Sequence, residues 1–255
     1  MFVSTLFLMA AAFVAGLVDS VVGGGGLIQL PALLVAHPEA APAVLLGTNR
    51  TSSIFGTSMA MLRYAREATI PWRTMLPAAV AAAAMSAAGA WTVTHVSSGS
   101  FKPLVLVVLI AVGIYTLIRK DFGRIHAPKL SPRRQLLVTI AACAAIGFYD
   151  GFLGPGTGSF LIFAFVGLLG FSFLAASASA KVVNVATNFT SLVYFVISGN
   201  VMPGIGLAMA ACNVAGSLVG TRLALARGSD FVRKLFLVVV PLVIVRFAYD
   251  IWLGR

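Results

Sequence analysis

"GLVDSVVGGGGLIQLPALL", residues 16–34, is an apolar stretch with four consecutive glycines and one carboxylate, Asp19. Each glycine inside a helix costs about 1 kcal/mol relative to alanine, so the first glycine cluster, residues 23–26, predicts a break in a helix. Non-helical backbone within a membrane is tolerated only where protein covers it or where it lines a cavity. The stretch therefore predicts a membrane helix that is broken at a functional site.

The composition is that of a membrane protein. Of 255 residues, 60% are hydrophobic and 10% are charged, whereas a soluble domain carries about 25% charged residues. Apolar runs near the length needed to cross a bilayer, about 20 residues, recur along the chain. They lie near 1–22, 43–63, 74–94, 101–118, 136–152, 175–198, 205–225 and 231–252, with shorter apolar pieces at 27–36 and 159–169. We expect an all-α polytopic membrane protein, one transmembrane domain over 1–255, in the cytoplasmic (inner) membrane.

The net charge of +11 is concentrated in the connections near 63–73, 119–134 and 222–234. Basic connections are typical of the cytoplasmic side of membrane proteins, and this interpretation is favoured over nucleic-acid binding. The lipid bilayer is thus an expected partner and nucleic acid is not, while homo-oligomerisation is left open. Because the start of the chain lacks a basic n-region, we expect the first segment to be retained. Cys143 and Cys212 lack metal spacing, and no metal or cofactor is expected.

The chain contains an internal repeat. A shift of 131 residues aligns Asp19 with Asp150, Gly23 with Gly154, Gly25 with Gly156, and Arg50 with Lys181. The repeats are predicted at 1–118 and 136–255, joined by a basic cytoplasmic loop, 119–135. Equivalent connections differ in charge, since 63–73 is basic and 199–204 is uncharged. We therefore expect two inverted-topology repeats, each with a glycine-broken helix or re-entrant hairpin plus three transmembrane helices, as in secondary transporters.

The two glycine clusters predict an anion site. Each precedes a short apolar helix whose first N–H groups and positive dipole end attract anions. The alternative is that the glycines only permit close helix packing. Charged residues within membrane spans are functional candidates, and Lys181 is favoured because Asn184 and Asn188 share its helical face. The expected substrate-binding residues are Gly23, Gly24, Gly25, Gly26, Thr48, Asn49, Arg50, Gly154, Gly156, Thr157, Gly158, Lys181, Asn184 and Asn188.

Two carboxylates accompany the glycine clusters. Asp19 and Asp150 are expected to cap the broken backbone, pair with the cations, or carry protons, and capping or pairing is favoured over proton coupling. As an alternative to anion binding, each cation is expected to pair with Asp19 or Asp150 as a structural bond. A test by Lys181→Met with Asp150→Asn takes Asp150 as the ion-pair partner of Lys181.

These residues resemble the sulfite exporter TauE/SafE family of membrane permeases. Besides the opening stretch, the resemblance rests on "LLGTNRTSSIFG" at 45–56, "GFYDGFLGPGTG" at 147–158 and "ASASAKVVNVATNFTSLVYF" at 176–195. It covers nearly the whole chain and implies a permease for small anions, with sulfite and organosulfonates as the named substrates. We expect export by alternating access around a midplane site; an anion-selective channel and an uptake permease are the alternatives. A membrane enzyme is disfavoured, since no HExxH or GxSxG motif occurs.

Overall fold

The computed structural model of the chain describes residues 2–96, 107 and 131–252, and every regular element in them is an α-helix. Five helices in this part are long and apolar enough to cross a membrane, and two shorter apolar helices accompany them. This confirms the all-α polytopic fold class. The expected span 101–118 and most of the connection 119–135 lie outside the described residues. The helices are α1 (Phe2–Val22), α2 (Gly26–Ala36), α3 (Pro42–Glu67), α4 (Trp72–Val93), α6 (Pro132–Phe152), α7 (Thr157–Leu169), α8 (Phe173–Ile197) and α9 (Pro203–Trp252).

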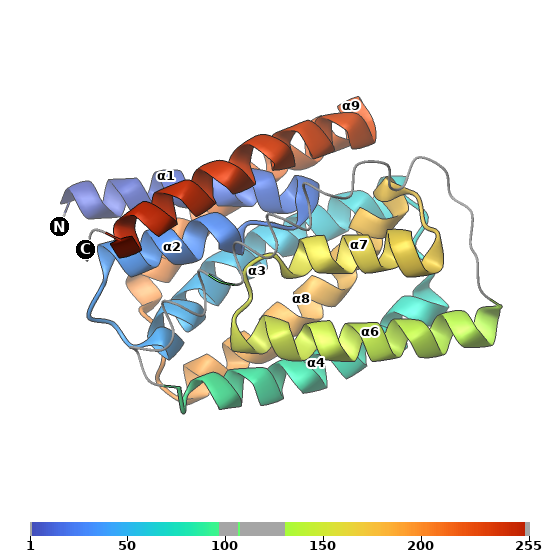
Figure 1. The fold of residues 1–255 in the computed structure, drawn as a ribbon, viewed down its shortest axis with the longest axis horizontal. Helices are drawn as coiled ribbons and strands as arrows, with labels where there is room; N and C mark the ends of the chain where they lie inside the picture. Colours follow the sequence, from blue (N-terminus) through green and yellow to red (C-terminus); the bar gives the residue numbers. More distant parts are fainter. Residues whose placement is uncertain (1, 97–106, 108–130, 253–255) are drawn as a thin grey trace.

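The helix starts follow the internal repeat of the sequence. The first residues of α2 and α7, of α3 and α8, and of α4 and α9 are each separated by 131 residues. Proline occupies the first turn of both α3 and α6, where its missing N–H has no intrahelical partner to lose. In Figure 1, α1 runs away from the end marked N, whereas α6 begins at the opposite end and runs back toward it. This arrangement supports opposed repeats; their orientation in a membrane stays a prediction.

The repeats are intertwined by close helix contacts. Helix α1 packs against α9, and α6 packs against α4, so each opening helix contacts a helix of the other repeat. A Cβ atom added to Gly216 would lie 1.9 Å from the carbonyl oxygen of Phe13, and one added to Gly151 would lie 1.9 Å from that of Ser86. Such distances require glycine, because the backbones themselves are in contact. Close helix packing therefore accounts for Gly216 and Gly151, which lie outside the two glycine clusters.

Helix α9 differs from the prediction. The sequence predicted separate spans at 205–225 and 231–252 with a connection at 226–234, but the backbone is helical without interruption from Pro203 to Trp252. The predicted non-helical connection is wrong. Residues 226–234 contain one glycine, Gly228, and no proline, and glycine weakens a helix by only about 1 kcal/mol where proline costs about 3 kcal/mol.

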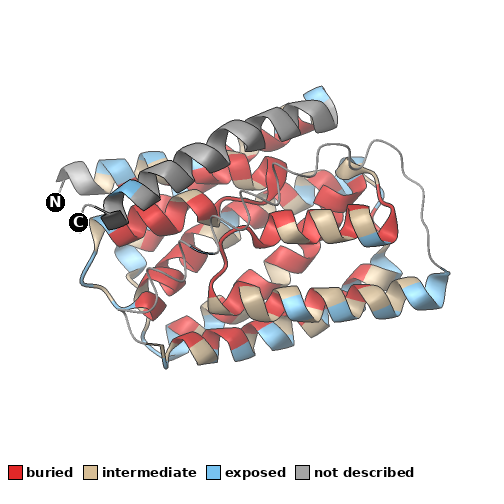
Figure 2. Cartoon of the chain, viewed as in Figure 1, coloured by how far each residue is buried: buried red, intermediate tan, exposed pale blue. Residues whose placement is uncertain are grey.

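Burial is arranged as expected for a protein in lipid. Figure 2 shows buried residues concentrated in the middle of the bundle and exposed ones along its outer helices. Large apolar side chains face outward, with Val80 70% and Ile197 82% exposed, while Lys181 and Gln29 are fully buried. Apolar side chains on the outside suit contact with lipid, and the buried polar groups mark the interior where a site can form.

The predicted inversion can be tested at two equivalent exposed connections. In a background with Cys143 and Cys212 replaced by alanine, Ser198→Cys is expected to react with an impermeant thiol reagent in intact cells. Arg66→Cys is expected to react only after permeabilisation, because its basic connection is predicted to be cytoplasmic. Both positions are exposed, so differences in labelling report the side of the membrane. Equal labelling from outside would contradict the inverted topology.

Candidate functional site

The two glycine clusters meet in the interior. Between α1 and α2, Gly23 has a φ of 75°, and between α6 and α7, Gly154 and Gly156 have φ values of 85° and 81°. The Ser159 N–H donates to the Gly23 carbonyl at 3.2 Å, and its hydroxyl donates to the Val22 carbonyl at 2.9 Å. The two broken segments, far apart in sequence, therefore touch and bond to each other through backbone groups.

Both intramembrane cations form ion pairs across the repeats. Arg50 Nη1 on α3 lies 3.0 Å from Asp150 Oδ1 on α6, and Arg50 Nη2 also donates to the Asp150 carbonyl. Lys181 Nζ on α8 lies 3.0 Å from Asp19 Oδ2 on α1 and also donates to the Asp19 carbonyl. The predicted pairing of Lys181 with Asp150 is therefore wrong. Each cation binds the carboxylate of the other repeat because the repeats are intertwined.

Asp19 contacts the first glycine cluster in addition to its ion pair with Lys181. Its Oδ1 accepts from the Gly25 N–H at 3.4 Å, and its Oδ2 accepts from the Thr57 hydroxyl at 3.1 Å. This is the expected capping of broken backbone by a side-chain carboxylate. The Asp19 side chain is 17% exposed, whereas that of Asp150 is 2% exposed, so the two equivalent carboxylates have different surroundings.

A small cavity lies between the two glycine clusters. Its volume is about 20 Å³, room for one or two water-sized groups. Helices α1, α3, α6, α7 and α8 supply its polar side chains. It is lined by Asp19, Gly23, Gly26, Asn49, Arg50, Ser53, Thr57, Asp150, Gly154, Thr157, Gly158, Asn184 and Asn188. Most of the residues expected at the site from the sequence are thus brought together here.

Two lining residues were absent from the expected set. Ser53 lies three residues after Arg50 and Thr57 lies four residues after Ser53, so all three share one face of α3. This periodicity was the available signal. Arg50 Nη1 also donates to Asn188 Oδ1 at 2.6 Å, which joins the polar faces of α3 and α8.

Some expected residues are not on the cavity wall. Gly24, Gly25, Gly156 and Lys181 are not among its lining residues. Thr48 has a packing role, because its hydroxyl donates to the Val44 carbonyl at 2.7 Å and accepts from the Met202 N–H at 3.0 Å. The cation at the wall is therefore Arg50, whereas the fully buried Lys181 contacts Asp19.

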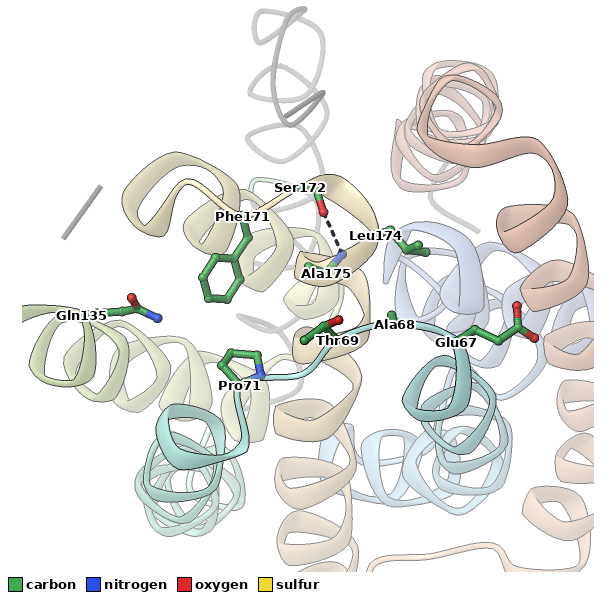
Figure 3. A pocket seen from close by; sticks show the side chains of 9 residues that line it. All are labelled: Glu67, Ala68, Thr69, Pro71, Gln135, Phe171, Ser172, Leu174 and Ala175. Atoms are coloured by element: carbon green, nitrogen blue, oxygen red, sulfur yellow. Dashed lines mark hydrogen bonds between the residues drawn. The ribbon is translucent and has the colours of Figure 1, made fainter. Parts of the chain in front are cut away.

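A second cavity is larger but lacks this chemistry. It measures about 520 Å³ and lies between the α3–α4 and α7–α8 connections (Figure 3). Among the described residues that line it, Glu67 is the charged one, and a carboxylate repels anions. The described residues contain no group of three or more His, Cys, Asp or Glu side chains placed to hold a metal ion. The small cavity is therefore the better candidate for an anion.

The glycines at the cavity can be tested by small substitutions. Gly23→Ala is expected to abolish transport, because its φ of 75° disfavours a side chain and the new Cβ would lie 2.4 Å from Gly158 Cα. Gly204→Ala is the control, since its Cβ would meet nothing within 4 Å. Transport rates in vesicles, compared at equal amounts of folded protein, measure the effect. Wild-type rates in Gly23→Ala would contradict a functional role for the close approach.

The fold and the cavity define a class, the polytopic helical membrane transporters, in which broken helices meet around a polar site. The family model described as "Sulfite exporter TauE/SafE" matches residues 8–247. The chain belongs to this family.

Bacterial relatives share the length of the chain and are named as transporters. A probable membrane transporter protein, ORF9, of Sinorhizobium sp is 36% identical over 98% of this chain and 96% of its own length. Another, of Haemophilus influenzae, is 32% identical over 95% of this chain and 94% of its own length. The probable membrane transporter protein YfcA of Escherichia coli is 30% identical over 95% of this chain and 89% of its own length. No solved structure was found to match the chain. The protein is thus a multi-pass membrane transporter and not an enzyme.

Proposed function

We propose that the protein is a secondary permease for a small anion and exports sulfite or an organosulfonate across the cytoplasmic membrane by alternating access. The observation that carries the proposal is the cavity at which Arg50 and both glycine clusters meet. The backbone N–H groups of the lining residues Gly26 and Gly158, at the starts of α2 and α7, and the Arg50 guanidinium are the kinds of donor that an oxyanion requires. The family description supports sulfite as the first substrate to test.

The ion pairs support alternating access. Arg50–Asp150 and Lys181–Asp19 each join an element of one repeat to an element of the other. An incoming anion competes with a carboxylate for the cation, so binding weakens a contact between the repeats. Differential contacts of this kind are what a ligand needs to shift a two-state equilibrium.

Export requires no additional coupling. In a cell with a negative interior, moving one negative charge outward is favoured by about 2.3 kcal/mol per 100 mV. Uptake of the same anion against this potential requires a co-transported cation.

The proposal is tested with purified protein in liposomes loaded with sulfite. We expect efflux that saturates with sulfite concentration, speeds up when the membrane potential is negative inside, and shows counterflow with external sulfite. Counterflow distinguishes a carrier from a channel. In a carrier, a gradient of unlabelled sulfite drives labelled sulfite transiently above its equilibrium concentration, whereas a channel produces no such accumulation. Absence of transport of sulfite, sulfonates and other small anions would contradict the proposal.

A further inference from the structure

The two equivalent carboxylates of the site differ in their hydrogen bonding. Both oxygens of Asp19 accept hydrogen bonds, Oδ1 from Gly25 and Oδ2 from Lys181 and Thr57. Asp150 Oδ1 accepts from Arg50, but its Oδ2 is buried and has no hydrogen-bond partner among the described residues. An unpaired buried acceptor costs about 1–3 kcal/mol, so it marks a group that a ligand can satisfy.

Two further unpaired atoms belong to the same cavity wall. Asn49 Oδ1 and Arg50 Nε are buried and have no partner in the part of the chain that the structure describes. With Asp150 Oδ2, the unpaired atoms of these three lining residues are one charged donor and two acceptors. A ligand that complements this set accepts a hydrogen bond from Arg50 and also donates a hydrogen bond of its own.

The charge of the site favours a ligand with a single negative charge. Arg50 is already neutralised by Asp150, and Lys181 by Asp19. Any bound anion therefore adds an uncompensated charge to a buried site of low dielectric, and a dianion adds twice as much. The unpaired Asp150 Oδ2 increases this repulsion, unless the ligand carries a hydrogen atom that lies between its own oxygen and Asp150 Oδ2.

We infer that the site selects a small monoanion that carries its own O–H or N–H donor, and that Asp150 Oδ2 is the acceptor for this donor. The cavity of about 20 Å³ widens to admit the anion as the anion displaces the ion pairs that join the repeats. This inference rests on the proposed function and narrows its substrate class. Hydrogensulfite and hydroxy- or amino-substituted sulfonates fit, whereas sulfate, dianionic sulfite and donor-free sulfonates leave the acceptors unpaired. Sites built to hydrogen-bond a ligand hydroxyl reject the analogue that lacks it for this reason.

The test compares two ligands of nearly equal shape. Binding of 2-hydroxyethanesulfonate and of propane-1-sulfonate, in which a methyl replaces the hydroxyl, is measured by calorimetry on the purified protein in lipid nanodiscs. We expect the hydroxylated anion to bind at least tenfold more tightly, about 1.4 kcal/mol. Sulfite affinity is expected to rise as the pH falls and the sulfite dianion is protonated to hydrogensulfite, and sulfate is expected not to bind.

Two variants separate the acceptor from the charge. Asp150→Asn keeps an amide oxygen toward Arg50 and places N–H donors at the former Oδ2 position, so the preference for the hydroxylated anion is expected to disappear. Asp19→Asn removes the same charge but leaves Asp150 Oδ2 in place, so the preference is expected to persist. If Asp150→Asn does not fold, the wild-type comparison of the two sulfonates decides alone.

The outcomes distinguish this inference from the proposed function. Equal binding of the two sulfonates by the wild type, or an equal loss of preference in both variants, overturns the inference and leaves the anion permease intact. Failure of every anion to bind or be transported overturns the proposed function and the inference together.

Discussion

Arg50→Met is expected to eliminate anion transport and to weaken anion binding at least tenfold, about 1.4 kcal/mol. Arg50 is the charged donor on the cavity wall, and its side chain is 4% exposed, so no solvent replaces the lost charge. The substitution also leaves Asp150 as an unpaired buried carboxylate, which typically costs 3–5 kcal/mol of stability. Reduced transport alone therefore does not distinguish binding from folding.

The double variant Arg50→Met/Asp150→Asn separates the two effects. It removes both charges, and we expect the thermal unfolding temperature to recover toward the wild-type value while transport stays absent. Arg50→Lys is the matched conservative variant: it keeps the charge but loses the fork that contacts Asp150 and Asn188 together, so intermediate binding is expected. Wild-type transport by the double variant would show that Arg50 is only a structural partner of Asp150.

Lys181→Met is expected to destabilise the protein and to reduce the amount folded in the membrane. Lys181 is fully buried, and both of its hydrogen bonds with described residues go to Asp19, which loses its cation in this variant. We expect Lys181→Met/Asp19→Asn to restore the thermal unfolding temperature and most of the transport rate, because Lys181 is not on the cavity wall.

The control for this pair uses the other carboxylate. Lys181→Met/Asp150→Asn is expected to unfold at a lower temperature than Lys181→Met alone, because Asp19 stays unpaired and Arg50 also loses its partner. A folded but inactive Lys181→Met/Asp19→Asn protein would instead place the lysine in the anion site, as the polar face of α8 predicts. Folding and transport measured on the same preparations distinguish the two results.

Hydropathy and periodicity alone established most of the fold. The apolar runs predicted membrane helices, and the described helices fall within a few residues of them because crossing a bilayer sets the length of an apolar helix. The offset of 131 residues predicted matching breaks at Gly23 and Gly154, and both have positive φ. The connection at 226–234 was mispredicted because its charges suggested a loop, although its residues tolerate a helix.

The sequence by itself thus determined the all-helical membrane class, the two broken helices and the residue types of the site. Only the tertiary structure decided which carboxylate pairs with which cation, and which cation faces the cavity. The partners lie 100 residues apart for Arg50 and Asp150 and 162 residues apart for Lys181 and Asp19. Spacing within one helix predicts which side chains share a face, but pairing between repeats depends on how their helices pack together, as α1 does with α9 and α4 with α6.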